Sequence, residues 1–231
     1  MANATLLELK DLVKAKRPET MDNPSFLGGF IDELINQAQR FVQLNLAHLG
    51  IKEWETTDVL SLSSGTLAEK NVKTAPLSTD CPNRLFDDER AIKYLDCKGA
   101  TNGNFEGFAF YVDDEVFLRR LRNSFQVPTL LEPIFTRHNQ LILIAPSTVI
   151  SAIAHYYKQV ADMTTDAANT QIPEMYEEHI VKRVLVDIDD ILGKLQNKQM
   201  DLQQLTTDLQ QSFQSQEIAV QSDKQPKGEL V

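Results

Sequence analysis

Cysteine is scarce in this chain of 231 residues, which contains only Cys81 and Cys97. Two cysteines cannot build a disulfide framework and their spacing matches no metal-binding pattern, so synthesis in a reducing cytoplasm is expected. Long hydrophobic runs are also lacking. The longest, 108–112 and 141–145, are far shorter than the about 20 apolar residues of a membrane-spanning helix. Charged residues near the N-terminus argue against a signal peptide. We therefore expect neither a membrane protein nor a secreted one.

Positive charge is limited as well, since 23 lysines and arginines stand against 33 aspartates and glutamates, for a net charge of −10. A protein that binds duplex nucleic acid usually carries a basic face that neutralises phosphates. The densest basic cluster, Arg119, Arg120 and Arg122, follows the acids at 113–115. The sequence therefore argues against a duplex-binding protein.

The remaining composition is typical of a globular protein, with 42% hydrophobic and 24% charged residues. A chain of this length fits one domain with extensions, or two small domains. Apolar residues at helical spacing predict helices at 3–16 and from 26 to 49. In the second helix, Phe30, Leu34 and Phe41 are expected to contribute to the core.

The middle of the chain, at about 56–158, predicts an irregular region with a small β element. Residues 63–86 are polar and rich in turn-forming residues, so no regular structure is expected there. A hairpin is predicted at 133–145 and a further strand at 149–157. We expect these strands to be antiparallel.

The segment 174–213 follows Pro173 and carries the longest periodic pattern in the sequence. Its apolar residues recur with heptad-like spacing, which predicts a helix that packs against other subunits. This apolar seam consists of Val181, Val184, Ile188, Ile191, Leu195, Leu202, Leu205 and Leu209. One such helix would span about 60 Å, more than the roughly 45 Å diameter of a compact chain of this size. It must protrude, break at Gly193, or pack on another chain.

Residues 215–231 are polar, so we expect an extended tail that becomes ordered on a partner. The apolar positions predicted to dock there are Ile218, Ala219, Val220, Leu230 and Val231. Together these patterns predict a mostly α fold. It would be a helical bundle over 1–214 with a small antiparallel β element (hairpin plus strand), a long C-terminal helix and an extended tail.

The residues that could carry chemistry form no recognisable site. Asp187 and Asp190 share a helix face, but no histidine or cysteine accompanies them, so a solvated helix face is favoured over a metal site. The four histidines lack a nucleophile or ligand at suitable spacing. Gly28-Gly29 lacks the lysine of a phosphate-binding loop, and no Gly-x-Ser-x-Gly occurs. We predict no catalytic residue, no metal and no cofactor.

Several short motifs follow one another in a particular order. The early helix contains LINQAQR at 34–40, and the hairpin ends in ILIAP at 142–146. The tyrosine pair 156–157 then leads to Ile-Pro at 172–173 and the long helix. In this order and spacing the chain resembles the head-to-tail connector adaptor proteins of tailed bacteriophages.

The resemblance covers 23–49 and 129–214, whereas 63–125 is longer than the family pattern. It implies a structural virion protein, made in the host cytoplasm and located at the head-tail junction. Such proteins form a homo-oligomeric ring, commonly of twelve subunits, beneath the portal protein. The ring extends the DNA channel, and DNA passes through without sequence-specific binding or any membrane contact. It also provides a platform for a tail or nozzle protein, while the C-terminal segment reaches into the portal.

Two other classes of protein stay open at this point. A coiled-coil scaffold, a chaperone or another neck protein would explain the heptad-like seam equally well, but it has no need of the hairpin 133–145. An enzyme, for instance a carboxylate hydrolase using Asp187 and Asp190, has no positive support in the sequence.

Overall fold

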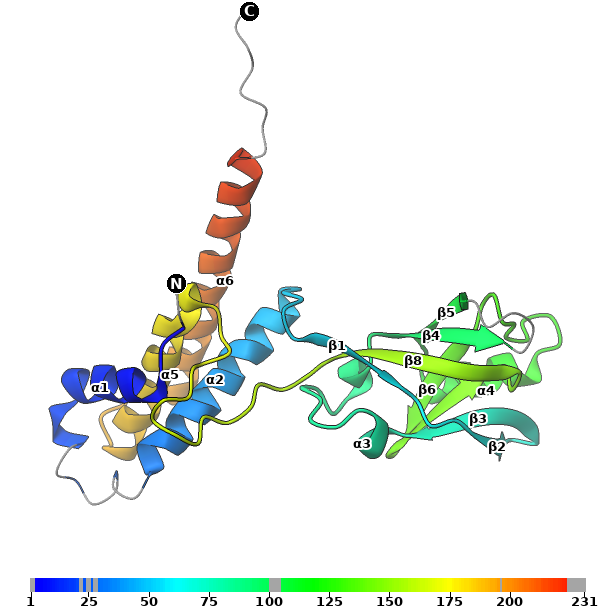
Figure 1. The fold of residues 1–231 in the computed structure, drawn as a ribbon, viewed down its shortest axis with the longest axis horizontal. Coiled ribbons are helices and arrows are strands. Elements are labelled where there is room, and N and C mark those ends of the chain that lie inside the picture. The colour runs from blue at the N-terminus through cyan, green and yellow to red at the C-terminus, as the bar shows by residue number, and fades with distance from the viewer. Residues whose placement is uncertain are drawn as a thin grey trace, which may run out of the picture. The chain divides into compact units, whose positions relative to one another are not determined.

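The computed structural model describes residues 3–20, 23, 26, 29–99, 105–195 and 197–223. The chain divides into two compact units, one made of 1–51 with 160–231 and the other of 52–159. The first unit is helical and the second is built on a β-sheet (Figure 1).

The helical unit consists of α1 (Leu6–Lys16), η1 (Pro18–Thr20), α2 (Phe30–His48), η4 (Glu174–Tyr176), α5 (Glu177–Ile191) and α6 (Lys198–Asp223). Helix α1 begins with a capping box, in which the Thr5 hydroxyl accepts from the Glu8 amide and the Glu8 carboxylate accepts from the Thr5 amide. Leu9 and Val13 of α1 are fully buried. Helix α2 packs against α1, α5 and α6, and α5 packs against α6.

The residues expected in the core of the early helix are covered to different degrees. Leu34 is buried, whereas Phe30 and Phe41 are half-buried. The guanidinium of Arg183 lies over the Phe41 ring, 5.2 Å from its centre. The deepest positions of α2 include Ile35, along with Ala38, Val42 and Leu46.

The long helix predicted at 174–213 is broken into two helices. Helix α5 ends at Ile191, Gly193 adopts a left-handed conformation with φ of 67°, and α6 begins at Lys198. Glycine adopts that conformation without the clash of a Cβ atom, which is why it so often terminates helices. The apolar seam therefore turns back on itself, and α5 and α6 pack together within one chain.

Helix α6 continues to Asp223, so residues 215–223 are helical and not extended. Figure 1 shows the end of α6 running beyond the other helices of its unit. The side chains of Ile218, Ala219 and Val220, like Leu230 and Val231 as a whole, lie outside the described residues.

The β-sheet unit contains eight strands in the order β1-β8-β4-β5-β6-β7-β3-β2. The strands are β1 (Glu55–Val59), β2 (Ser63–Leu67), β3 (Lys70–Pro76), β4 (Tyr94–Gly99), β5 (Phe105–Tyr111), β6 (Ile134–His138), β7 (Leu141–Ala145) and β8 (Val149–Tyr157). Between them lie α3 (Leu77–Asp80), η3 (Glu89–Ala91) and α4 (Asp114–Arg122). All neighbours are antiparallel except β5 and β6, which pair in parallel.

The expectation of a mostly α fold with a small antiparallel β element was wrong. The sheet is mixed and curled, and the structure is 26% strand and 43% helix. The hairpin β6–β7 is present, but β8 pairs with β1 and β4 and not with the hairpin. The stretch 63–86, expected to be irregular, contains the local hairpin β2–β3, and β3 also pairs with β7 far away in the sequence. The pairing with β7 leaves no local signal, and the hydroxyl-rich residues of β2 resemble a loop.

The two faces of the sheet have different cores. Ile142 and Ile144 of β7 belong to the larger of the two hydrophobic clusters. Leu143 and Ala145 point to the opposite face, where they share a cluster with Phe117 of α4. This alternation along one strand is the expected period of two, and it places α4 on the face of the sheet opposite to the larger cluster.

Candidate functional site

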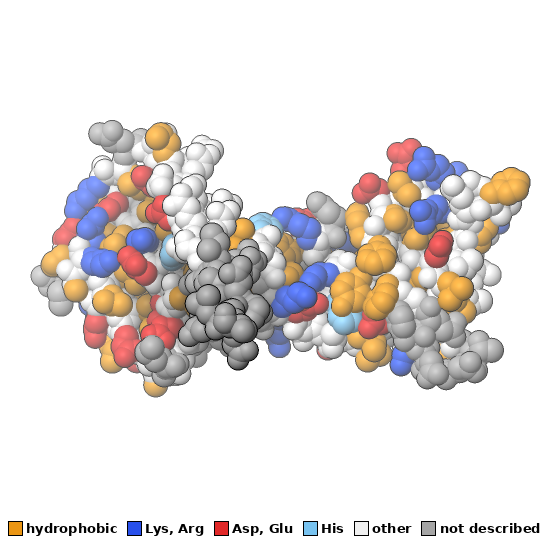
Figure 2. Space-filling model, turned by 90° about the horizontal axis from the view of Figure 1, so that it is seen from above, with side chains coloured by type: hydrophobic (Ala, Val, Ile, Leu, Met, Phe, Trp, Pro, Cys, Tyr) orange, Lys and Arg blue, Asp and Glu red, His pale blue; other side chains and the backbone are white. Residues whose placement is uncertain are grey.

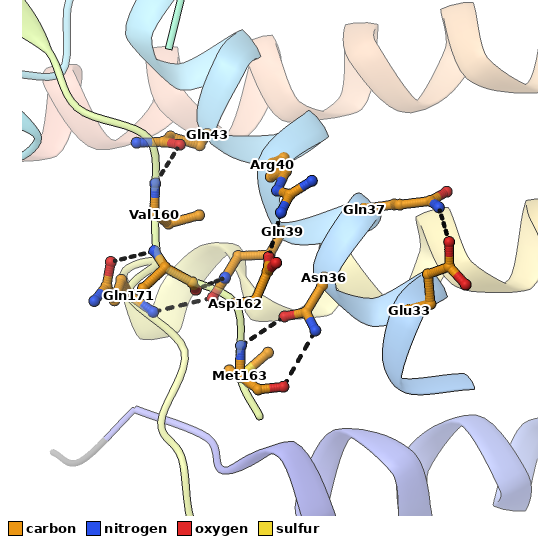
Figure 3. A network of polar contacts seen from close by, with 11 residues as sticks. Glu33, Asn36, Gln37, Gln39, Arg40, Gln43, Val160, Asp162, Met163 and Gln171 are labelled. Atoms are coloured by element: carbon orange, nitrogen blue, oxygen red, sulfur yellow. Dashed lines mark hydrogen bonds and ion pairs between the residues drawn. The ribbon is translucent and has the colours of Figure 1, made fainter. Parts of the chain in front are cut away.

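The motif LINQAQR lies on α2 and aligns amide side chains along one side of that helix. Asn36, Gln39 and Gln43, here called the amide ladder, follow one another at intervals of three and four residues. Because residues at this spacing share a helix face, the three amides can contact one extended segment. That segment is 160–172, which returns from the sheet unit to α5 (Figure 3).

The outer members of the amide ladder bind the start of this segment. The Gln43 side-chain oxygen accepts from the Val160 amide at 3.0 Å. Asn36 forms a reciprocal pair with Met163, accepting from its amide at 2.8 Å and donating to its carbonyl at 3.2 Å. Arg40, on the same face, forms an ion pair with Asp162.

The central residue, Gln39, is fully buried and makes three hydrogen bonds. Its nitrogen donates to the Ala161 carbonyl at 3.1 Å. Its oxygen accepts from the Thr170 hydroxyl at 2.7 Å and from the Gln171 amide at 3.1 Å. Gln39 therefore joins both ends of the returning segment to α2. An apolar residue here would leave these buried groups unpaired, which costs about 1–3 kcal/mol per group.

Asp187 and Asp190 of α5, weighed above as metal ligands, and their neighbour Asp189 are held by basic side chains. Asp189 forms a two-point ion pair with Arg17, with nitrogen–oxygen distances of 2.8 and 2.6 Å. Its hydrogen bond to Arg17 lowers the pKa of the Asp189 carboxyl. Lys198 contacts Asp187 at 3.0 Å and Asp190 at 2.9 Å. Asp187 also pairs with Arg183 and is buried, so the expectation of a solvated face is wrong for Asp187, whereas Asp190 is exposed.

The histidines and cysteines lie apart from one another in structural settings. His155 contacts Asp96 at 2.9 Å and stacks on Tyr94, and His179 is buried in α5, where burial lowers its pKa. Burial raises the pKa of both Cys81 and Cys97 to about 12, so their thiols stay protonated at neutral pH. The part of the chain that the structure describes holds no cluster of three or more metal-ligating side chains.

Most of the predicted apolar seam is already covered within one chain. Val181, Val184, Ile188, Leu205 and Leu209 are buried. Leu195 and Leu202 are half-buried, and Ile191 is 45% exposed. Among the residues of the seam, only Ile191, Leu195 and Leu202 therefore retain exposed surface that could contact another subunit.

Sequence reasoning missed the role of Gln39 and Gln43 in the interior. The signal available was the spacing of the amides along the same face as the apolar residues Ile35, Val42 and Leu46. Polar residues are usually interpreted as solvent-facing, and only the position of 160–172 shows that they are not.

The polar groups of α2 and α5 described above join segments of the chain to one another. A family model described as "SU10 adaptor protein" matches residues 4–226. The chain belongs to this family and is a phage head-to-tail adaptor protein, which confirms the family indicated by the sequence motifs. A search of curated proteins found no match.

Family membership makes this chain a structural protein of the bacteriophage head-tail connector. It implies a non-catalytic role, association with portal and tail proteins, and a place at the head-tail junction of the virion. Among the described residues, no helix has both the length and the apolar character needed to cross a membrane.

Proposed function

We propose that this chain forms a ring of twelve copies beneath the portal protein, where it extends the DNA channel and offers a platform to a tail or nozzle protein. The family match over residues 4–226 carries this proposal. The helical unit would be the ring-forming part, with the region 56–158 inserted into it.

The C-terminal segment 215–231 would dock on the portal. Leu205 and Leu209 anchor the first half of α6 in the helical unit. Beyond them α6 continues to Asp223 and projects from its own unit (Figure 1). An anchored helix that projects in this way supports a role in reaching a partner. The docking residues would be Ile218, Ala219, Val220, Leu230 and Val231.

Packing between neighbouring helical units would use the part of the seam that one chain leaves uncovered. Ile191, Leu195 and Leu202 lie at the turn between α5 and α6 and at the start of α6. Their exposed surface supports a contact between subunits there, while the buried members of the seam stabilise the subunit itself.

Passage of DNA through the ring without sequence-specific binding is supported by the net charge of −10. A wall of the same sign as the phosphates repels DNA and does not retain it. The coiled-coil scaffold is not favoured, because the heptad-like seam is folded into a helical hairpin within one chain.

The test is native mass spectrometry of the protein mixed with the portal ring encoded by the same genome. We expect one defined assembly in which twelve copies are added to each portal. Failure of the folded protein to bind the portal would contradict the proposal. A defined ring of another number would correct the stoichiometry alone.

A further inference from the structure

The end of α4 carries an unusual concentration of exposed basic and apolar side chains. Arg119 and Arg122 are exposed and line a groove of about 480 Å³ together with Glu115, Leu118 and Asn123, so two cationic groups face one carboxylate there. Phe125 follows immediately and is 95% exposed, more than any other large hydrophobic side chain in the described part of the chain. Its amide donates to the Asn123 side chain at 2.9 Å, so Phe125 sits in a defined turn. Leu131, also exposed, lies farther along the same connection.

These arginines differ from most other arginines in this acidic protein. Arg17, Arg40, Arg84, Arg90 and Arg183 each have a carboxylate partner. Arg119, Arg120 and Arg122 form no ion pair with any residue that the structure describes. Arginine and aromatic residues are enriched at protein–protein interfaces. The α4 surface, meaning Leu118, Arg119, Arg122 and Phe125, therefore fits an acidic and apolar partner.

The helical unit has a groove that is both acidic and partly apolar. Glu8, Asp11, Glu174 and Glu177 surround a groove of about 530 Å³ that Leu12 also lines. None of these four carboxylates has a cationic partner among the described residues. Burial and the neighbouring carboxylates Glu174 and Glu8 raise the pKa of Glu177, so a cation placed here would relieve repulsion. Figure 2 shows that acidic and basic side chains both occur on each unit, so the complementarity is local to the two grooves.

We propose that the α4 surface of one copy docks into the acidic groove of a second copy. The two surfaces differ, so the contact is head-to-tail and repeats from copy to copy, which is the kind of interface that closes a ring. Opposite charges bring the surfaces together, and Phe125 with Leu12 supplies apolar contact. The inference rests on the proposed ring and adds a second contact between neighbouring copies to the packing of helical units proposed above.

Charge exchange between copies tests the contact. One variant carries Arg119→Glu and Arg122→Glu, and another carries Asp11→Lys and Glu174→Lys; all four positions are exposed, so both variants should fold. We expect each variant alone to lose at least tenfold in self-association by sedimentation velocity, and to fail to fill the ring on the portal. Mixing the two variants should restore assembly, because each offers the charge that the other lacks.

A matched control carries Lys52→Glu and Lys70→Glu, which are exposed and change the net charge by the same amount. This control should assemble like the wild type. If the arginine variant fills the portal ring like the wild type, the interface is wrong while the proposed function stands. If mixing gives no rescue but all four substitutions in one chain do, the contact lies within a chain and the inference is overturned. Failure of the wild type to bind the portal would instead contradict the proposed function.

Discussion

Single amide side chains decide how the chain returns from the sheet unit to the helical unit. Gln39 accepts two hydrogen bonds and donates one while fully buried, and Gln43 holds the first residue of the returning segment. A glutamine can do this because it offers a donor and an acceptor at the end of a flexible stem. The polar residues of LINQAQR are therefore explained by the fold of the subunit.

Gln39→Ala should destabilise the helical unit. The substitution leaves the Thr170 hydroxyl, the Gln171 amide and the Ala161 carbonyl without their partner, so we expect a loss of about 2–4 kcal/mol in the free energy of unfolding. Urea unfolding followed by circular dichroism measures it. Gln37→Ala is the control, since Gln37 is exposed on the same helix and should change stability by less than about 0.5 kcal/mol. Equal effects of the two substitutions would show that Gln39 is not clamping the segment.

The ion pair between Arg17 and Asp189 should make stability depend on pH. Arg17 lowers the pKa of Asp189 in the folded protein, so the stabilisation is complete above the unfolded value of about 4. It is lost as pH falls through the lowered folded value. Asp189→Asn should therefore cost about 1–2 kcal/mol at pH 7. The difference in free energy of unfolding between this variant and the wild type should be smaller when urea unfolding is repeated at pH 3. A difference that is independent of pH would contradict this assignment.

At the scale of elements, the helical hairpin α5–α6 shows that the spacing of apolar residues alone does not tell where a helix ends. The residue that ends the helix must be identified as well. The apolar spacing continues across Gly193, but the chain turns there and the seam closes on itself. The same spacing that predicted packing between subunits instead builds much of the core of one subunit. What remains exposed is Ile191 and its neighbours at the turn.

Ile188→Asp and Ile191→Asp separate the two roles of the seam. Ile188 is fully buried, so an aspartate there should cost several kcal/mol through an unpaired buried charge. Ile191→Asp should leave the melting temperature nearly unchanged, because its side chain is half in solvent. Thermal unfolding measures both, and Ile191→Asp is then tested for ring formation on the portal. Full assembly of the Ile191 variant would remove this residue from the proposed subunit contact.

At the scale of the whole molecule, the chain combines a helical unit built from both ends of the sequence with a sheet unit built from its middle. The first and last strands along the chain, β1 and β8, pair with each other. Their register runs from Glu55 opposite Tyr157 to Val59 opposite Ile153. Both connections therefore leave the sheet side by side. A unit with adjacent ends can sit within another without disturbing its fold.

Removing residues 215–231 should abolish portal binding and leave the fold intact. The deleted stretch follows the buried anchors Leu205 and Leu209, so thermal unfolding should shift little. Portal binding, measured by native mass spectrometry, should be lost. A shorter deletion of 224–231 serves as the comparison and separates the two halves of the segment. Portal binding by the longer truncation at wild-type strength would show that this segment is not the docking element.

The sequence by itself determined the class of protein, through the order of its motifs, and also the early helix and the hairpin β6–β7. It offered Gly193 as one of three possible outcomes for the long helix, and the structure decided for the break. The early helix and the hairpin depend on residues that lie near one another in the chain, where period and turn signals act. Tertiary structure alone decided that β2 and β3 join an eight-stranded mixed sheet, that Asp187 is buried beside Arg183, and that Gln39 faces the interior. These outcomes depend on partners far away in the sequence, and hydrogen-bond and charge satisfaction there can be known only once those partners have been placed.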